Sequence, residues 1–151
     1  MELNILLAYI GIALLTGGSL AASAIAVSIC GRTAIGAIKK RPEGFGTYLI
    51  LCALPNTQGI YGILGYVMLS DFLTPYVTLL QASALFGLGL MIAVVGNFAS
   101  IGQARICANG IEATAAGHNV TTRTIIMAVF PESFAIFALL IMFLVRATIM
   151  V

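Results

Sequence analysis

One carboxylic acid, Glu132, lies near the middle of a stretch that is otherwise almost entirely apolar, IIMAVFPESFAIFALLIMFLV at positions 125–145. About 20 apolar residues are enough to cross a bilayer. A charged carboxylate at that depth costs roughly 2.5–3.5 kcal/mol on insertion scales, so acids inside membrane segments usually have a function. We predict that Glu132 binds a cation or a proton inside the membrane. The alternative is a neutral, hydrogen-bonded acid that only holds helices together.

Polar side chains in two other apolar segments could complete such a site. The motif LPNTQGIYG at positions 54–62 contains Thr57, Gln58 and Tyr61, and Gln103 lies in a later segment. Unpaired polar groups are costly at membrane depth, so these side chains need partners on another helix or an ion. Glu132 would supply the charge, and the hydroxyl and the two amides would supply neutral oxygens. Tyr61 could hold the carboxylate in place through a hydrogen bond.

Pro55 interrupts the second apolar segment, because a proline has no backbone N–H to donate. We expect a kink there, with the carbonyl of Leu51 left without its usual partner and main-chain carbonyls available as further ligands. One carboxylate surrounded by neutral oxygens has no net charge once a monovalent cation is bound. That neutrality lowers the cost of moving the loaded site past lipid.

The composition excludes most other classes of protein. Of the 151 residues, 61% are hydrophobic and 8% are charged, against about 25% charged residues in soluble domains. The chain is therefore expected to be an integral membrane protein without a separate soluble catalytic domain. Its net charge of +2 gives no indication of nucleic-acid binding. Three cysteines without CxxC spacing and a single histidine in a loop predict neither a disulfide framework nor a metal site of their own.

Four transmembrane helices are predicted to position the polar residues. We expect them at residues 4–37, 47–69, 76–109 and 121–146, with polar turns at 39–46 and 70–75 and a polar loop at 110–120. At 1.5 Å per residue the third helix is about 50 Å long, more than the ~30 Å hydrocarbon core, so it must protrude. The first and third helices are rich in glycine, alanine and serine, which allow close packing in lipid.

The two halves of the chain repeat each other. Each half has a small-residue helix, a polar connection and a second helix with a central proline, and Pro55 and Pro131 lie 76 positions apart. The same shift pairs Asn56 with Glu132. The predicted fold class is therefore all-α and transmembrane, with two tandem helical hairpins in the same orientation. The first hairpin spans residues 1–75, and the second spans residues 76–151 and carries the acid.

The basic residues predict an orientation in the membrane. All but one of them lie in or near the connections at 39–46 and 110–120, namely Arg32, Lys39, Lys40, Arg41, Arg105 and Arg123. Arg146 lies alone near the other end. The positive-inside rule then places both connections in the cytoplasm and both chain termini on the extracytoplasmic side.

Taken together, these features resemble the duplicated proteolipid subunit of V-type ATPases, most closely the bacterial sodium-translocating kind. The resemblance rests on LPNTQGIYG in the second helix, a glutamate in the fourth, the duplicated hairpins and KKRPEGFG in the first connection, and it covers nearly the whole chain. It implies a non-catalytic subunit that assembles with identical copies into a membrane rotor ring. It also implies a stationary membrane subunit with a basic group that displaces the ion, and central stalk subunits that couple the ring to ATP hydrolysis elsewhere.

The resemblance gives each polar residue a role. The implied ion ligands are Glu132, the main-chain carbonyl of Leu54, and the side chains of Thr57, Gln58 and Gln103. Tyr61 matches the tyrosine that holds the carboxylate. The implied ion is Na⁺, with H⁺ as the alternative, and no nucleotide is expected on this chain, which has no phosphate-binding glycine loop.

Two positions depart from the family pattern. Pro131 stands directly before Glu132, where we expect a bend that frees the carbonyl of Met127. Ser133 follows Glu132, where sodium-type members commonly have threonine. Two other function classes also stay open at this point. One is a four-helix ion transporter or channel without a motor, and the other is a purely structural subunit in which Glu132 only packs.

Overall fold

The computed structural model describes residues 2–150, and all regular structure in that range is helical. The α-helices and the short 3-10 helices (η) are α1 (Glu2–Lys40), η1 (Pro42–Gly44), α2 (Phe45–Ala53), η2 (Leu54–Asn56), α3 (Thr57–Leu69), η3 (Ser70–Phe72), α4 (Leu79–Ala115) and α5 (Thr121–Ile149). The all-α fold predicted from the sequence is confirmed over this range.

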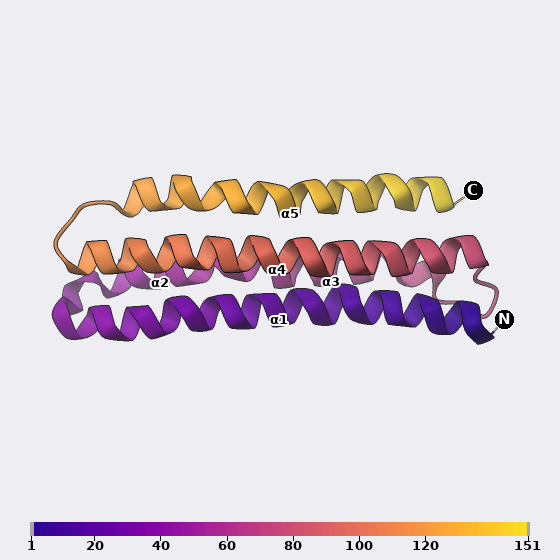
Figure 1. Ribbon diagram of the computed structural model, residues 1–151, viewed down its shortest axis with the longest axis horizontal. Helices are drawn as coiled ribbons and strands as arrows, with labels where there is room; N and C mark the ends of the chain where they lie inside the picture. Colours follow the sequence, from indigo (N-terminus) through magenta and orange to yellow (C-terminus); the bar gives the residue numbers. More distant parts are fainter. Residues whose placement is uncertain (1, 151) are drawn as a thin grey trace.

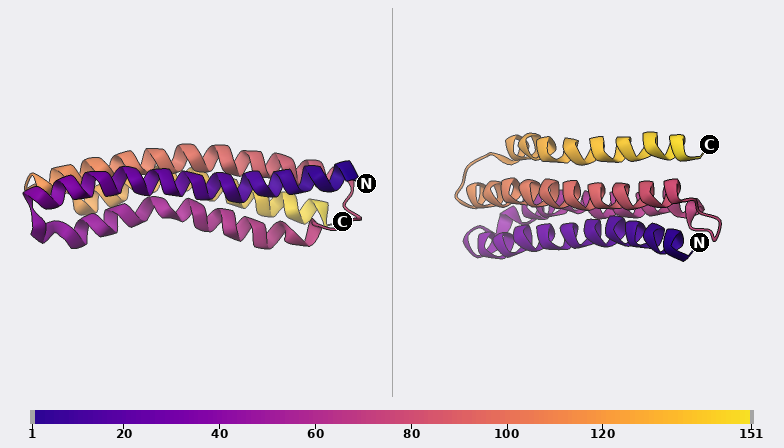
Figure 2. Two further views of the ribbon diagram at one scale, coloured as in Figure 1. Left: turned by 90° about the horizontal axis from the view of Figure 1, so that it is seen from below. Right: turned by 45° about the vertical axis from the view of Figure 1, so that its right-hand side comes forward.

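The helices form four rods that lie side by side (Figures 1 and 2). The rods are α1, the interrupted α2–η2–α3, α4 and α5. The start of α1 and the end of α5 lie at one end of the bundle, and the connections after α1 and after α4 lie at the other (Figure 1). The chain is thus two helical hairpins with the same orientation, as the repeat predicts.

Three of the rods are long and apolar enough to cross a bilayer: α1 with 39 residues, α4 with 37 and α5 with 29. The second rod is interrupted, because Pro55 lies in the 3-10 turn η2. Its parts α2 and α3, with 9 and 13 residues, are each too short to cross alone, but together they extend over residues 45–69. The sequence predicts a kink at Pro55, and the structure has this 3-10 turn there.

Pro131 has a different effect from Pro55. It lies inside α5, which continues as one α-helix from Thr121 to Ile149. Figure 1 shows α5 running alongside α4 over its length. Pro131 therefore does not interrupt the helix, although a proline cannot donate the hydrogen bond to Met127 O.

The start of α4 differs from the prediction by three residues. It begins at Leu79 rather than at position 76, because Thr78 and Gln81 form a capping box. The Thr78 hydroxyl accepts a hydrogen bond from Gln81 N (3.2 Å), and Gln81 Oε1 accepts one from Thr78 N (3.1 Å). The helix ends at Ala115 rather than at 109, so Glu112, expected in a loop, is helical. The other helices extend only two or three residues beyond their predicted bounds.

The late end of α4 has a packing explanation. Gly110 does not stop the helix, because it allows close approach to α5: a Cβ there would overlap Thr124. The helix stops instead at Gly117, whose φ of 95° lies in the left-handed region. His118 N then donates to Ala113 O (3.1 Å), which completes a Schellman motif.

Helices α1 and α4 are the most closely packed pair in the bundle. A Cβ on Gly89 would overlap the carbonyl oxygen of Gly11, and a Cβ on Gly18 would overlap the Cβ of Ala93. Glycine at these positions brings the two backbones into direct contact, as the small residues in both helices predict. In contrast, α3 and α5 make few contacts with each other.

Candidate functional site

A layer of buried polar side chains lies between two apolar cores. The buried polar residues are Ser19, Ser23, Gln58, Ser100, Gln103, Thr124 and Glu132. The apolar core at the end with the chain termini extends as far as Leu15 on α1, Ile92 on α4 and Ala138 on α5. The apolar core at the end with the connections begins at Ala26 on α1, Ala104 on α4 and Ala128 on α5. Apart from Thr124, every buried polar residue on these three helices falls inside those intervals. The polar layer therefore crosses the middle of the bundle.

Glu132 of α5 bonds three side chains of α3 in this layer. The Tyr61 hydroxyl donates to Oε1 (2.5 Å), and the Thr57 hydroxyl donates to Oε2 (2.8 Å). The Gln58 amide donates a longer hydrogen bond to Oε2 (3.5 Å). Glu132 is 9% exposed and Gln58 is 2% exposed. The fold thus brings together four of the residues singled out from the sequence, from two helices far apart along the chain.

The turn η2 places a main-chain carbonyl beside these side chains. The Thr57 hydroxyl lies 3.3 Å from Leu54 O, within hydrogen-bonding distance. Leu54 O also accepts the backbone N–H of Thr57, as in a 3-10 turn. Leu54 therefore joins the group through Thr57.

Two serines that the sequence analysis did not assign to the site hold η2 in place. Ser23 Oγ of α1 donates to Asn56 O (3.1 Å) and accepts a hydrogen bond from Gly59 N (2.7 Å). Ser100 Oγ of α4 donates to Pro55 O (3.0 Å). The carbonyls of Pro55 and Asn56 need hydrogen-bond donors inside a membrane, and these two serines supply them. The signal in the sequence was a serine in each small-residue helix.

Gln103 of α4 lies in the polar layer but makes no hydrogen bond to Glu132. It is 3% exposed, and its Oε1 has no hydrogen-bond partner among the described residues. The preceding residue, Gly102, faces Pro131: a Cβ on Gly102 would lie 3.7 Å from the Pro131 Cβ. Gln103 directly follows Gly102, and Glu132 directly follows Pro131. Gln103 therefore lies at about the same level of the bundle as Glu132.

The site offers one acid and several neutral oxygen atoms. Hard monovalent cations prefer oxygen ligands, and a proton needs only the carboxylate. The unpartnered oxygen of Gln103 is free to accept a ligand, whereas the three hydrogen bonds from α3 hold the carboxylate in position. Over residues 2–150, no cluster of three or more His, Cys, Asp or Glu side chains is arranged for metal binding.

The cysteines and the histidine lie outside this group. Cys30, Cys52 and Cys107 are free thiols, and Cys30 Sγ donates to Ala104 O (3.3 Å) within the core near the connections. His118 lines a polar hollow between the two connections. In the described part of the chain, none of these side chains is hydrogen-bonded to Glu132, whose partners are on α3.

Comparison with known sequences shows the same duplication. The family of the ATP synthase C subunits matches residues 10–69 and again residues 86–145. The second match is displaced from the first by 76 positions, which is the shift between Pro55 and Pro131.

Two characterised proteins are similar to this chain over most of its length. One is the V-type sodium ATPase subunit K of Enterococcus hirae, 35% identical over 122 residues, which are 81% of this chain and 78% of the relative. The other is the A-type ATP synthase subunit K of Methanocaldococcus jannaschii, 32% identical over 138 residues, which are 91% of this chain and 60% of the relative. The chain belongs to the family of the ATP synthase C subunits and is a duplicated, non-catalytic, ion-translocating proteolipid of the membrane.

Proposed function

We propose that this chain is a rotor-ring subunit of a rotary ATPase and that it carries Na⁺ across the membrane on Glu132. The observation that carries the proposal is the contact of Glu132 with Thr57 and Gln58 beside η2, where a carboxylate, a hydroxyl and a main-chain carbonyl oxygen lie close to the Gln58 amide. The Enterococcus hirae relative is a sodium ATPase subunit, which favours Na⁺ here as well. ATP hydrolysis takes place in other subunits and turns the ring.

The proposed sodium ligands are the carboxylate of Glu132, the carbonyl of Leu54, and the side-chain oxygens of Thr57, Gln58 and Gln103. Tyr61 holds the carboxylate from the other side through Oε1. A single carboxylate balances a single Na⁺, so the loaded site is neutral and can face lipid at low cost. The unpartnered Oε1 of Gln103 supports this set, because a buried amide oxygen without a partner is costly unless a ligand uses it.

Carbodiimide labelling of Glu132 tests the proposal, since carbodiimides react with the protonated acid. At fixed pH, Na⁺ should slow the labelling of the purified protein, with the modified residue located by peptide mass spectrometry and with Glu132→Gln as the unlabelled control. If pH alone changes the rate, the carried ion is H⁺. If Glu132 is never labelled in any buffer, it is a packing residue and the proposal is wrong.

The proposed ring is formed by repeating the contact that already joins the two hairpins. Inside the chain, α4 and α5 pack on a surface of the first hairpin that includes Gly18, Pro55 and Gln58. With the 76-residue shift, the equivalent positions in the second hairpin are Val94, Pro131 and Phe134. All three line an apolar groove of about 540 Å³ between α4 and α5. The second hairpin therefore presents the equivalent surface as an open groove, with no segment of residues 2–150 filling it.

The matching face lies at the other side of the first hairpin. The α4 and α5 residues that contact the first hairpin include Ala93, Ser100 and Glu132, and their equivalents are Gly17, Ala24 and Asn56.

All three equivalents are exposed, and a Cβ on Gly17 would meet nothing within 4 Å. Ala24 and Asn56 line a second shallow groove. We propose that this face of one copy fills the α4–α5 groove of the next. Such a head-to-tail contact closes a ring when the rotation from one copy to the next is a whole fraction of a full turn.

A cysteine pair tests the ring contact. Within the chain a Cβ on Gly18 would touch the Ala93 Cβ, so by the repeat Val94 of one copy should touch Gly17 of the next. In a background without the native cysteines, Val94→Cys with Gly17→Cys should form a ladder of cross-linked oligomers on oxidation. Val94→Cys with Gly36→Cys is the matched control, because Gly36 is equally open but about 28 Å further along α1. Cross-linking of the control alone would contradict the proposed contact.

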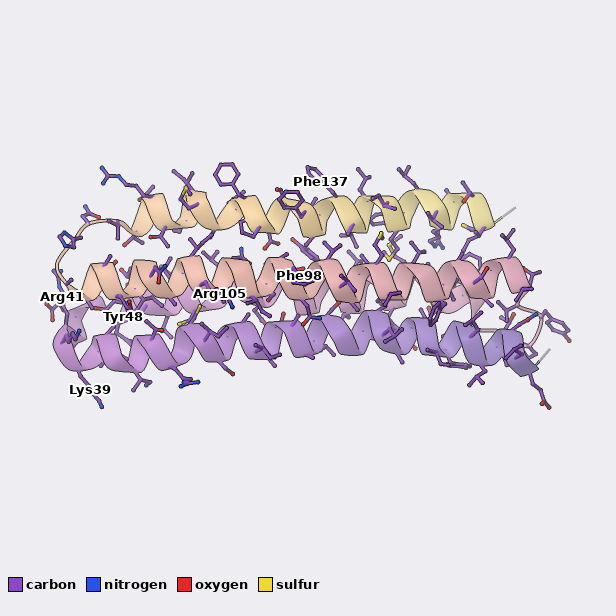
Figure 3. The ribbon with its side chains drawn as sticks, viewed as in Figure 1. Lys39, Arg41, Tyr48, Phe98, Arg105 and Phe137 are labelled. Atoms are coloured by element: carbon purple, nitrogen blue, oxygen red, sulfur yellow. The ribbon has the colours of Figure 1, made fainter. Side chains whose placement is uncertain are left out.

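We assign the end with the two connections to the cytoplasm. Lys39 and Arg41 lie at that end (Figure 3). Arg41 pairs with Glu43 (3.0 Å) and donates to Thr114 O (3.4 Å), so the first connection is linked to the last turn of α4. Beside this link lies a polar hollow of about 370 Å³, where the central stalk subunits are expected to dock.

Glu43, at the end of the bundle with the two connections, is stabilised in its ionised form. A hydrogen bond from its own backbone N–H lowers the pKa of Glu43, and Arg41 adds to the effect.

Membrane-impermeant thiol reagents should label a cysteine at Glu43 only from the cytoplasmic side and a cysteine at Asp71 only from outside. The reverse pattern would invert the orientation.

A further inference from the structure

Asn56 takes the place of Glu132 in the first half of the repeat. It directly precedes Thr57, which bonds Glu132, so it lies at the depth of the ion site. Unlike Glu132, Asn56 is exposed, and it lines a shallow groove on the first hairpin. An amide that faces lipid at this depth is costly, because lipid tails offer it no hydrogen bond. Asn56 is therefore expected to meet a polar group in the assembled protein.

The groove around Asn56 corresponds to a face that is buried inside the chain. Three residues of α1 line it together with Asn56, namely Ser23, Ala24 and Val27. With the 76-residue shift, the four equivalents in the second hairpin are Ala99, Ser100, Gln103 and Glu132. All four are buried, and Ser100 and Glu132 bond the first hairpin directly. The groove is thus the same kind of face, left uncovered in a single copy.

The second hairpin also repeats the partner of that face. Within the chain Glu132 meets the Thr57 hydroxyl, which lies beside the carbonyl oxygen of Leu54. The equivalents of Thr57 and Leu54 are Ser133 and Phe130. Ser133 Oγ donates to Phe130 O at 2.7 Å, so the pair of hydroxyl and carbonyl is present a second time. Phe130 lines the α4–α5 groove that the next copy is proposed to fill.

The other groups of the site are not repeated. The equivalents of Gln58 and Tyr61 are Phe134 and Phe137, which pack edge to face with their ring centroids 6.3 Å apart. Neither ring supplies an oxygen ligand, and Asn56 has no charge to balance a cation. The equivalent place between two copies therefore suits a neutral hydrogen bond.

We infer that Asn56 of one copy donates a hydrogen bond from Nδ2 to Oγ of Ser133 in the next copy. The direction follows from the observed bond of Ser133, whose proton goes to Phe130 O and whose oxygen can still accept. The inference rests on the proposed ring contact. In an otherwise apolar groove, this bond fixes how neighbouring copies align along the helix axes, as a buried asparagine fixes register in coiled coils.

A double-mutant cycle on the purified full-length ring tests the bond. The readout is the temperature at which half of the rings dissociate in SDS. Asn56→Leu and Ser133→Ala should each lower it by several degrees, because the lost bond recurs at every contact between copies. The double variant should fall no further than the more affected single variant, since both substitutions remove the same bond.

Two further variants separate the hydrogen bond from packing. Ser133→Thr keeps the hydroxyl and should dissociate as the wild type does, because threonine already stands at the equivalent position 57. Thr122→Ala is the control for loss of a hydroxyl on α5. Thr122 is exposed, and its equivalent Gly46 has nothing within 4 Å of an added Cβ, so it lies off the contact. Labelling of Glu132 by carbodiimide should be unchanged in every variant, which shows that each copy is folded.

The outcomes separate this inference from the proposed ring. If Val94→Cys and Gly17→Cys cross-link as proposed but Asn56→Leu dissociates at the wild-type temperature, the bond is absent and the ring contact stands. Additive effects in the double variant, or an equal loss in Thr122→Ala, would also overturn the bond. If no ring is isolated and no cross-linked ladder forms, the ring contact is wrong, and the bond is wrong with it.

Discussion

Tyr61 on α3 donates its hydroxyl to Oε1 of Glu132 on α5 at 2.5 Å, across the boundary between the two hairpins. Helices α3 and α5 otherwise make few contacts, so hydrogen bonds to this one carboxylate account for much of what joins them. The position of the acid is therefore determined by both copies of the repeat. A single hairpin would contain either the acid or its partners, but not the pair.

Removing the Tyr61 hydroxyl should loosen the carboxylate without disturbing the packing. In Tyr61→Phe we expect Glu132 to be labelled by carbodiimide about ten-fold faster or more, because a lost hydrogen bond to a charged acceptor is worth about 1.5–3 kcal/mol. Tyr66→Phe, on the exposed side of the same helix, is the control and should label at the wild-type rate. Equal rates in all three proteins would show that the Tyr61 hydrogen bond does not restrain the acid.

Neutralising the acid should abolish transport and leave the subunit folded. Glu132→Gln keeps the shape of the side chain but cannot balance the charge of a cation. Reconstituted with the rest of its ATPase, the variant should show no ATP-driven uptake of radioactive Na⁺ into vesicles. Glu2→Gln, in the exposed first turn of α1, should transport normally. Uptake by Glu132→Gln at the wild-type rate would rule out the carrier role of this residue.

Gln103→Leu should separate binding from stability. The substitution removes a buried amide whose oxygen has no partner, so the melting temperature in Na⁺-free buffer should stay level or rise. Loss of one ligand should nevertheless weaken protection of Glu132 by Na⁺ about ten-fold, the equivalent of roughly 1.4 kcal/mol. A lower melting temperature with unchanged protection would mean that Gln103 is a packing residue.

The glycine contact between α1 and α4 should be intolerant of a methyl group. In Gly89→Ala the Cβ would overlap the carbonyl oxygen of Gly11, and backbone atoms cannot move aside cheaply. We expect a loss of about 1–3 kcal/mol or more in stability, measured as a lower melting temperature of the purified protein. Gly87→Ala, two residues earlier on an open side of α4, is the control and should melt as the wild type does.

The parts of the fold that follow from local chemistry could be predicted from the sequence. Long apolar segments separated by polar turns indicated four rods, and the missing N–H of Pro55 indicated the break at η2. The end of α4 could not be predicted in this way. Gly110 has the local character of a helix stop, but its role is decided by Thr124 on another helix.

The polar layer shows a similar division. The sequence identified the acid and the motif of the second helix, because polar groups stand out against an apolar background. It did not identify Ser23 and Ser100 as donors to η2, since their roles depend on how the helices are aligned along one another. Helices that are apolar all round carry no amphipathic pattern from which that alignment could be read.

The contrast between the two helix pairs has a geometric consequence for the proposed ring. Glycines draw α1 and α4 together until their backbones touch, whereas α3 and α5 stay apart. A unit that is narrower along one side than along the other is a wedge. Copies of a wedge placed edge to edge turn by the same angle at each step, so the taper fixes how many complete a circle. A methyl group added at Gly11 or Gly89 would push α1 and α4 apart, widen the narrow side of the subunit and change the curvature of the ring.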